Sequence, residues 1–270
     1  MTYIALNTAA TGLDSMSTKL DVIANNLANI NTPGFKSNTT SFEDLMYIER
    51  QQPGLEDGNG YRKPLGLNIG LGTNISGTQL DFSQGSQDQT NQPLDVLIDG
   101  TGLFRVEVPQ EFSENGIGYT RNGHFQLNED GQLVLANSTG NLLISNVTID
   151  PQNQGVQIRQ DGEVFYQEPG AIEMTKAGRI EIASFVNPGG LKSVGQNIYV
   201  ETVASGEPLV GSPGEDDRGT LLQGSLEASN VQPVVQLVDL IKTQRAFEMN
   251  SQVIQAANEA LQQINNLRRF

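Results

Sequence analysis

The residue types that carry catalytic chemistry are scarce in this chain. His124 is the only histidine and cysteine is absent, so a nucleophilic triad or a zinc site would have to be built around one imidazole. His124 follows Asn122 and Gly123 beside an expected β-hairpin, and we favour a structural role for it. We therefore expect no catalytic residue and no metal ligand, and we expect that the protein is not an enzyme.

Other patterns that bind ions or nucleotides are present only in part. Residues 126–131 resemble a calcium-binding loop weakly, because Gln126 occupies its first ligand position and Asn137 its last. The pair Gly100 and Gly102 lacks the third glycine of a dinucleotide fingerprint, and no Gly-Lys-Ser/Thr sequence follows any glycine cluster. We interpret these segments as turns and expect no cofactor.

The charge distribution argues against nucleic-acid and membrane partners. The chain has 270 residues, a net charge of -15 and a pI of about 4.4, and such an acidic protein repels nucleic acid and anionic lipid. Both chain ends are close to neutral, so the acidic excess lies in the centre. No apolar run approaches the roughly 20 residues that span a bilayer, and no signal-peptide pattern is visible. A location outside the cytoplasm would therefore need a dedicated export route.

The elements that position these residues begin with an apolar stripe in the first thirty residues. The stripe consists of Leu6, Ala9, Leu13, Met16, Leu20, Ile23, Leu27 and Ile30. Their alternating steps of three and four are typical of a helix that packs against one or two other helices. We expect this helix to end in the segment 31–34, because Pro33 disfavours helical geometry at Thr32.

A second heptad pattern occupies the C-terminal forty residues. Leu240, Phe247, Ile254 and Leu261 recur every seven residues, with Thr243, Asn250, Ala257 and Ile264 at the interleaved positions. Polar residues at such positions weaken a helix seam but fix its register. We expect the N- and C-terminal helices to pair as a coiled-coil hairpin. The alternative is that both helices pack on one ordinary core.

The middle of the chain divides into two compositions. Residues 37–92 are rich in Ser, Thr, Gln, Asn and Gly, which predicts an extended linker arm, with a short helix or anchor around residues 42–48. Residues 93–227 contain short apolar runs separated by turn signals, which predict an all-β domain. Asp130-Gly131 and Asp161-Gly162 are expected to form hairpin turns.

Together these patterns predict an α+β fold in four segments. Residues 1–36 are expected to form the N-terminal helix, 37–92 the extended arm, 93–227 the central β domain and 228–270 the C-terminal helix.

Two motifs at opposite ends of the chain carry a family resemblance. Ala24-Asn25-Asn26-Leu27-Ala28-Asn29-Ile30-Asn31-Thr32-Pro33-Gly34-Phe35-Lys36 resembles the N-terminal signature of flagellar rod and hook proteins. Gly224-Ser225-Leu226-Glu227-Ala228-Ser229-Asn230-Val231 and Gln244-Arg245-Ala246-Phe247-Glu248-Met249-Asn250-Ser251 resemble the entry to the last helix of that family and the helix motif that follows. The resemblance covers essentially the whole chain, more loosely in the middle.

Within the family, the middle of the chain resembles the distal rod members. The β domain is modest in size, and residues 65–73 look like the extended insertion of those members. The closely similar proximal rod members that carry a β domain remain an alternative, because the acidic centre and the irregular segment 212–219 depart from the expected pattern. An extracellular β-rich binding module is the alternative from another class.

The resemblance implies a structural subunit of the flagellar basal body that polymerises into a helical tube and transmits torque. It implies export by the flagellar type III apparatus without a cleavable signal, into a periplasmic rod. The implied partners are copies of the chain itself, other rod proteins, the hook protein and surrounding ring proteins.

The residues expected to carry assembly come from the two signatures and the helix stripes. They are Leu13, Leu20, Asn25, Asn26, Leu27, Asn29, Thr32, Gly34, Phe35, Lys36, Gly224, Glu227, Ser229, Asn230, Val231, Gln244, Arg245, Phe247, Asn250, Ile254 and Leu261.

Overall fold

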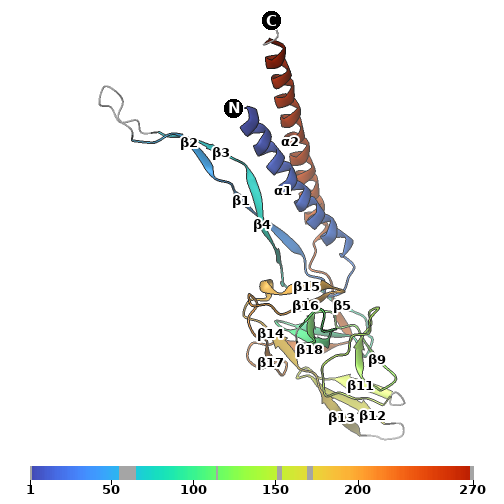
Figure 1. Cartoon of the computed structure of the whole chain (residues 1–270). Helices are drawn as coiled ribbons and strands as arrows, with labels where there is room; N and C mark the ends of the chain where they lie inside the picture. The colour runs from blue at the N-terminus through green and yellow to red at the C-terminus, as the bar shows by residue number, and fades with distance from the viewer. Residues whose placement is uncertain (1, 55–64, 114, 151–153, 169–172, 268–270) are drawn as a thin grey trace. The chain divides into compact units, whose positions relative to one another are not determined.

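The computed structural model describes residues 2–54, 65–113, 115–150, 154–168 and 173–267, and it contains both helices and strands (Figure 1). Long helices lie at the two ends of the chain and strands fill the centre, which confirms the predicted mixture of helical ends and a β centre. Among the described residues, neither helix is long and apolar enough to cross a membrane.

The bounds of the elements follow the chain in order. They are α1 (Thr2–Ala28), β1 (Asn38–Asp44), β2 (Tyr47–Gln51), β3 (Leu67–Gly70), β4 (Thr73–Leu80), β5 (Gln87–Gln89), β6 (Val96–Asp99), β7 (Leu103–Glu107), β8 (Ile117–Thr120), β9 (Phe125–Leu127), β10 (Leu133–Leu135), β11 (Gln154–Ile158), β12 (Glu163–Gln167), β13 (Met174–Arg179), β14 (Ile182–Ser184), the short 3-10 helix η1 (Pro188–Gly190), β15 (Lys192–Gly195), β16 (Ile198–Val200), β17 (Leu209–Gly211), β18 (Thr220–Gln223), β19 (Ser225–Glu227) and α2 (Pro233–Leu267).

The chain folds into two compact units, neither of which is continuous in sequence. The helical unit contains residues 1–27, 38–79 and 233–270, and the β unit contains residues 28–37 and 80–232. The predicted arm over residues 37–92 is therefore divided between the two units. The segment 28–37 follows α1 in sequence but belongs to the β unit.

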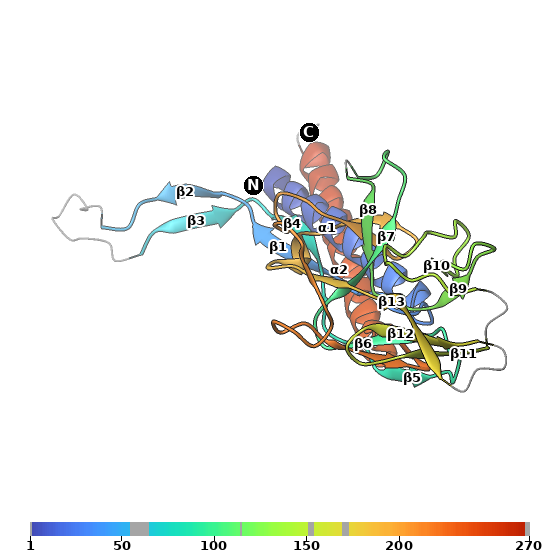
Figure 2. The same ribbon diagram turned by 90° about the horizontal axis from the view of Figure 1, so that it is seen from below.

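In the helical unit, α1 and α2 lie side by side (Figures 1 and 2). Asn26 Nδ2 donates to Gln236 Oε1 over 3.4 Å. Further toward the N-terminus of α1, a Cβ added to Gly12 would lie 2.9 Å from Asn250 Nδ2. The two terminal helices are thus in contact, as predicted. Their supercoiling as a coiled coil stays a prediction.

The apolar stripe of α1 is its less exposed side, but the helix buries little. Ala9 and Ile23 are the apolar residues of α1 that are fully buried, and Leu13 and Leu20 are half-buried. A second, polar side of α1 is also covered, where Ser15 Oγ lies 3.5 Å from the carbonyl oxygen of Thr73 on β4. A hairpin therefore covers a face of α1 that has no apolar pattern in the sequence.

That hairpin is made by two consecutive strand pairs, β1 with β4 and β2 with β3. The Leu45 N–H donates to the Gly72 carbonyl over 2.9 Å, and the Leu71 N–H donates to the Met46 carbonyl over 3.2 Å, which joins the two pairs. The alternative of a short helix around residues 42–48 was wrong, because cross-strand backbone bonds hold these residues extended. Phe42 nevertheless acts as an anchor, since its ring lies 5.6 Å from Lys19 Nζ of α1.

The hydrophobic core of the molecule lies in the β unit. A six-stranded sheet with the order β15-β16-β8-β7-β14-β17 packs with smaller sheets, among them β11-β12-β13 and β18-β6. Fully buried apolar residues such as Phe104, Ile149, Val164 and Ile182 form its main cluster. Both predicted hairpins are confirmed, because β9 pairs with β10 and β11 pairs with β12 in antiparallel register.

Candidate functional site

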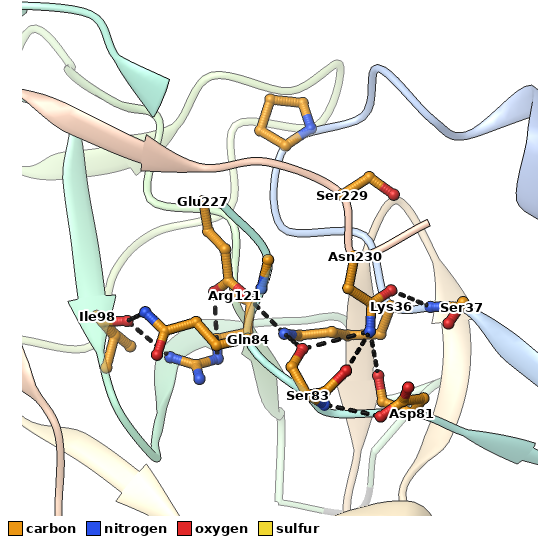
Figure 3. A network of polar contacts seen from close by, with 12 residues as sticks. Lys36, Ser37, Asp81, Ser83, Gln84, Ile98, Arg121, Glu227, Ser229 and Asn230 are labelled. Carbon is orange, nitrogen blue, oxygen red and sulfur yellow. Dashed lines mark hydrogen bonds and ion pairs between the residues drawn. The ribbon is translucent and has the colours of Figure 1, made fainter. Parts of the chain in front are cut away.

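The two terminal signatures meet in the β unit, around the carboxylate of Glu227 (Figure 3). Lys36 comes from the end of the first signature, and Glu227 comes from β19 inside the second. The Lys36 ammonium lies 2.6 Å from Glu227 Oε1, and both side chains are almost completely buried, at 0% and 1% exposure. Motifs 191 positions apart in sequence therefore form one buried ion pair.

A second cation, Arg121, lies on the other oxygen of the same carboxylate. Its Nε is 3.5 Å from Glu227 Oε2, and its side chain is 4% exposed. The remaining guanidinium nitrogens donate to the carbonyls of Ile98, over 3.2 Å, and Gly100, over 2.5 Å. Arg121 thereby connects the turn between β6 and β7 to β19.

Burial dominates the electrostatics of both cations. Desolvation lowers the pKa of Lys36 below its ordinary value, although the charge and hydrogen bond of Glu227 act in the opposite direction. Desolvation likewise lowers the pKa of Arg121 against the attraction of Glu227 and Asp99. For both cations burial is the first cause of the lowered pKa, and repulsion from Arg121 also lowers the pKa of Lys36.

Asn230, the last polar residue of the second signature, organises the backbone around this ion pair. Its Oδ1 accepts from the Ser37 N–H over 2.8 Å, and its Nδ2 donates to the Asp81 carbonyl over 2.8 Å. Its own N–H donates to the Phe35 carbonyl over 3.3 Å. One side chain thus ties the segment after α1 to the segment before α2.

Gly34 fits this junction because it has no side chain. Its φ of +69° lies in the left-handed region, and an added Cβ would lie 2.7 Å from the backbone carbon of Arg121. The Gly34 N–H also donates to the Glu227 carbonyl over 2.7 Å. The Pro33-Gly34 turn therefore places the first signature directly on β19.

The remaining residues that were predicted to carry assembly lie in three parts of the structure. Gly224, Ser229 and Val231 flank the ion pair on the strand side, and Thr32 and Phe35 flank it on the side of the first signature, all buried or half-buried. Asn26 is buried in the helical unit, whereas Asn25 is exposed and Leu27 and Asn29 are half-buried. On α2, Asn250, Ile254 and Leu261 are half-buried, while Gln244, Arg245 and Phe247 are exposed. That these residues carry assembly stays a prediction.

Sequence reasoning missed the groups that the central strands contribute. Arg121 and the carbonyl of Ser83, which accepts from Lys36 Nζ over 2.7 Å, lie outside both signatures. The Gly85 N–H, which donates to Glu227 Oε1 over 2.8 Å, does so too. Two of these groups are backbone, which composition cannot identify. The signal for Arg121 was an arginine within a strand-rich, acidic segment, which does not by itself indicate burial.

In the described structure, the contacts of His124 are those of a structural residue. His124 Nδ1 lies 2.6 Å from Asp95 Oδ1, and Asp95 also accepts from the Thr90 hydroxyl over 2.5 Å. This contact joins two neighbouring loop segments, where residues 95 and 124 form an isolated β-bridge. Among the described residues, no group of three or more acidic or histidine side chains is placed to hold a metal ion.

Comparison with known proteins assigns the chain to a family. Residues 6–36 match the family described as flagella basal body rod protein, residues 97–166 match the flagellar hook protein FlgE/F/G D1 domain, and residues 222–267 match the flagellar basal body rod FlgEFG protein C-terminal family. The first and third matches contain Lys36 and Glu227, the two residues of the buried pair.

Similar proteins extend over nearly the whole chain. The flagellar basal-body rod protein FlgG of Agrobacterium fabrum is 42% identical over 94% of this chain and 95% of its own length. The FlgG protein of Borreliella burgdorferi is 38% identical over 98% of both chains. The flagellar hook-basal body complex protein FlhP of Bacillus subtilis is 28% identical over 97% of this chain and 98% of its own. With its two end signatures joined in one buried site, this chain belongs to the flagellar basal-body rod protein family.

Proposed function

We propose that the chain is a structural subunit of the distal flagellar rod, which polymerises into a helical tube and acts as a drive shaft that transmits torque to the hook. The proposal is supported by family membership and by the distribution of apolar surface. It includes the prediction that the protein is not an enzyme and works without a cofactor.

The main observation that supports the proposal is the apolar surface that α2 leaves exposed. Its members are Val234, Val235, Leu237, Val238, Ile241, Phe247, Met249, Val253 and Ile264, with exposed fractions between 37% and 73%. The face of α2 that includes Leu240, Thr243, Asn250, Ile254, Ala257 and Leu261 is less exposed. A soluble monomer rarely leaves such a stripe uncovered, so we infer that copies of the chain cover it in the polymer.

The pairing of the terminal helices gives the polymer its geometry. One face of α2 is used by α1 of the same chain, so the exposed face remains for neighbours. A head-to-tail contact that does not close into a ring generates a helical filament. We propose that the paired helices, supercoiled as a coiled coil, form the inner tube and that the β units form its outer shell.

Location and partners follow from the same proposal. The subunit is exported by the flagellar type III apparatus and resides in the periplasmic rod. Its neighbours are other rod proteins and the hook protein at the two ends of the tube, and ring proteins around it. The β-domain-bearing proximal rod protein is a second candidate. It is less favoured because the relatives that align over nearly the full length with 33–42% identity are named FlgG.

Complementation of a deletion strain tests the proposal. Basal bodies from cells that lack the protein should end before the distal rod when viewed by electron microscopy, and the full chain should restore the rod and hook. A chain without residues 2–27 should be exported but should restore neither. Restoration by that truncated chain, as expected of an extracellular binding module, would reject the proposal, and basal bodies that end before the proximal rod is complete would favour the second candidate.

A further inference from the structure

The carboxylate of Glu227 contacts two cations, which come from different parts of the chain. Lys36 lies on Oε1 and Arg121 on Oε2, and all three charged groups are buried. A single carboxylate therefore balances either cation alone. Because removal of both cations would leave a buried charge uncompensated, the two are expected to substitute for each other in part.

Apart from the Lys36 pair and the backbone bond from Gly34 to the Glu227 carbonyl, the groups described above that hold Arg121 and Glu227 lie in residues 80–232 of the β unit. Arg121 is fixed by the carbonyls of Ile98 and Gly100. Glu227 lies on β19, which pairs with β5, and its Oε1 also accepts from the Gly85 N–H. All of these groups belong to residues 80–232. The acceptor for the Lys36 ammonium is therefore complete before Lys36 arrives.

The segment 28–37, here called the connecting segment, is held mainly by polar contacts. Besides the Lys36 pair, they include the backbone bonds of Gly34 to Glu227, of Asn230 to Phe35 and of Asp81 to the Ser37 carbonyl. The Ser37 N–H also donates to Asn230 Oδ1, and Asn197 Nδ2 donates to the Pro33 carbonyl. Phe35 is only half-buried. Ile30 and Pro33 are half-buried as well, so no apolar side chain of the connecting segment is fully buried. Few buried apolar contacts are typical of segments that open locally, and the desolvation of Lys36 also opposes docking.

We propose that the connecting segment is a latch that docks into a preformed ammonium-binding site on the β unit, and that Arg121 is the positioning residue that keeps Glu227 aligned for Lys36. The latch opens and closes while the core of the β unit stays folded. The latch does not require polymerisation, so it does not depend on the proposed function.

Hydrogen exchange in the full-length monomer tests the latch. In the unaltered chain, the amides of Gly34 and Ser37, which are bonded to Glu227 and Asn230, should exchange at least tenfold faster than buried core amides such as that of Phe104. K36M should raise exchange of the connecting segment at least a further tenfold and leave core exchange unchanged. K36R, which keeps the charge, should restore most of the protection.

Arg121 gives a second, independent readout. R121M should raise exchange of the Gly34 and Ser37 amides although Lys36 is intact, and the double variant K36M/R121M should destabilise the β unit by more than the sum of the single effects. K176M, which removes a lysine from a more exposed pair with Glu163, is the matched control and should leave the connecting segment unchanged.

Two outcomes would overturn the latch. One is exchange of the connecting segment and the core at one common rate in the unaltered chain. The other is strict additivity of K36M and R121M. Because both are measured in monomers, they are separate from the electron microscopy that tests the proposed function.

Discussion

At the scale of single residues, the junction of the two signatures depends on a glycine that no other residue replaces without strain. Gly34 combines a left-handed backbone with contact against the backbone of Arg121, so an alanine there has both a conformational cost and a steric one.

We therefore predict that Gly34→Ala lowers the free energy of unfolding of the β unit by about 3 kcal/mol. Gly140, with a φ of +61° and open space around its Cβ position, is the matched control, and Gly140→Ala should cost only about 1 kcal/mol. Urea denaturation followed by tyrosine fluorescence measures both. Equal costs for the two variants would contradict the close packing of Gly34 on residue 121.

Asn26 is a second residue whose side chain forms hydrogen bonds with backbone groups. Its Oδ1 accepts from the Asn38 N–H over 2.9 Å, and its Nδ2 donates to the Asn38 carbonyl over 2.8 Å. Both ends of the amide are thus used at the start of β1.

Asn26→Ala should therefore destabilise the helical unit by about 2 kcal/mol, because it leaves two backbone groups of Asn38 without their partner. Asn7, exposed on the same helix, supplies the control Asn7→Ala, which should change stability by less than about 0.5 kcal/mol. Thermal unfolding followed by circular dichroism at 222 nm distinguishes them. A neutral Asn26→Ala variant would show that water replaces these bonds.

At the scale of elements, helices and strands with a strong local sequence pattern were predicted correctly, and those with a weak pattern were not. Asp130-Gly131 and Asp161-Gly162 fixed two hairpins, because a left-handed turn position leaves few alternatives. The apolar stripe correctly predicted the less exposed side of α1. Heptad spacing places apolar residues on one side of a helix, whichever helix packs against it. The strands around residues 42–48 were missed. Phe42 and Ile48 are partly exposed, so apolar and polar residues do not alternate regularly between a buried and an exposed face.

The candidate site was predictable only in part. The signatures contained Lys36, Glu227 and Asn230, but the sequence does not indicate that these three converge. Arg121 could not be predicted, because the pairing of β5 with β19 and the turn between β6 and β7 bring it to Glu227. Long-range strand pairing of this kind has no local sequence signal.

The β12–β13 hairpin carries an ion pair whose effect depends on pH. Hydrogen bonds from Lys176 and Arg179 hold the pKa of Glu163 below its ordinary value of 4.5. The unfolded chain therefore binds this proton more readily than the folded chain. The stability that ionised Glu163 contributes is present above about pH 4.5 and is lost as the pH falls through the lower pKa of the folded state.

We predict that the stability difference between the unaltered chain and E163Q is largest near neutral pH and shrinks below about pH 4.5. Urea denaturation between pH 6 and pH 3 measures this difference. A difference that stays constant across this range would show that the carboxylate is not coupled to Lys176 and Arg179.

At the scale of the whole molecule, the division of apolar surface separates folding from assembly. The β unit has a dense core of its own. Among the side chains that the structure describes, two apolar ones of α1 are buried and nine large apolar ones of α2 are exposed. Folding of the single chain therefore leaves the helical ends incompletely buried, and we propose that association with other copies completes their burial.

Replacing exposed apolar residues of α2 should thus impair assembly more than folding. L237S combined with V253S should lower monomer stability by no more than about 2 kcal/mol, because both side chains are about half exposed in the single chain. Each loss should weaken every subunit contact by about 1 kcal/mol, so rods should be short or absent in electron micrographs. Q252S, at an exposed polar position of the same helix, should form normal rods, and normal rods from the apolar variant would exclude the stripe from the subunit interface.

The β2–β3 hairpin is predicted to stiffen the polymer by bridging subunits. Met46, Tyr47 and Leu67 are exposed on it in the single chain, at 82%, 58% and 54%. Because Leu45 and Gly72 are joined by a backbone bond, residues 46–71 can be replaced by an Asn-Gly turn without breaking the β1–β4 pair. Rods of this variant should assemble but bend in electron micrographs, and straight rods would assign stiffness to another element.

In the proposed rod, the two terminal helices of each chain pack against each other and form the wall of a tube made of many copies. Cryo-electron microscopy of intact basal bodies at side-chain resolution measures their position directly. We expect α1 and α2 of each subunit on the inner wall, with Val238, Met249 and Val253 buried against neighbouring copies and the β units outside. Terminal helices that point away from the axis, or that contact no other copy, would contradict the account.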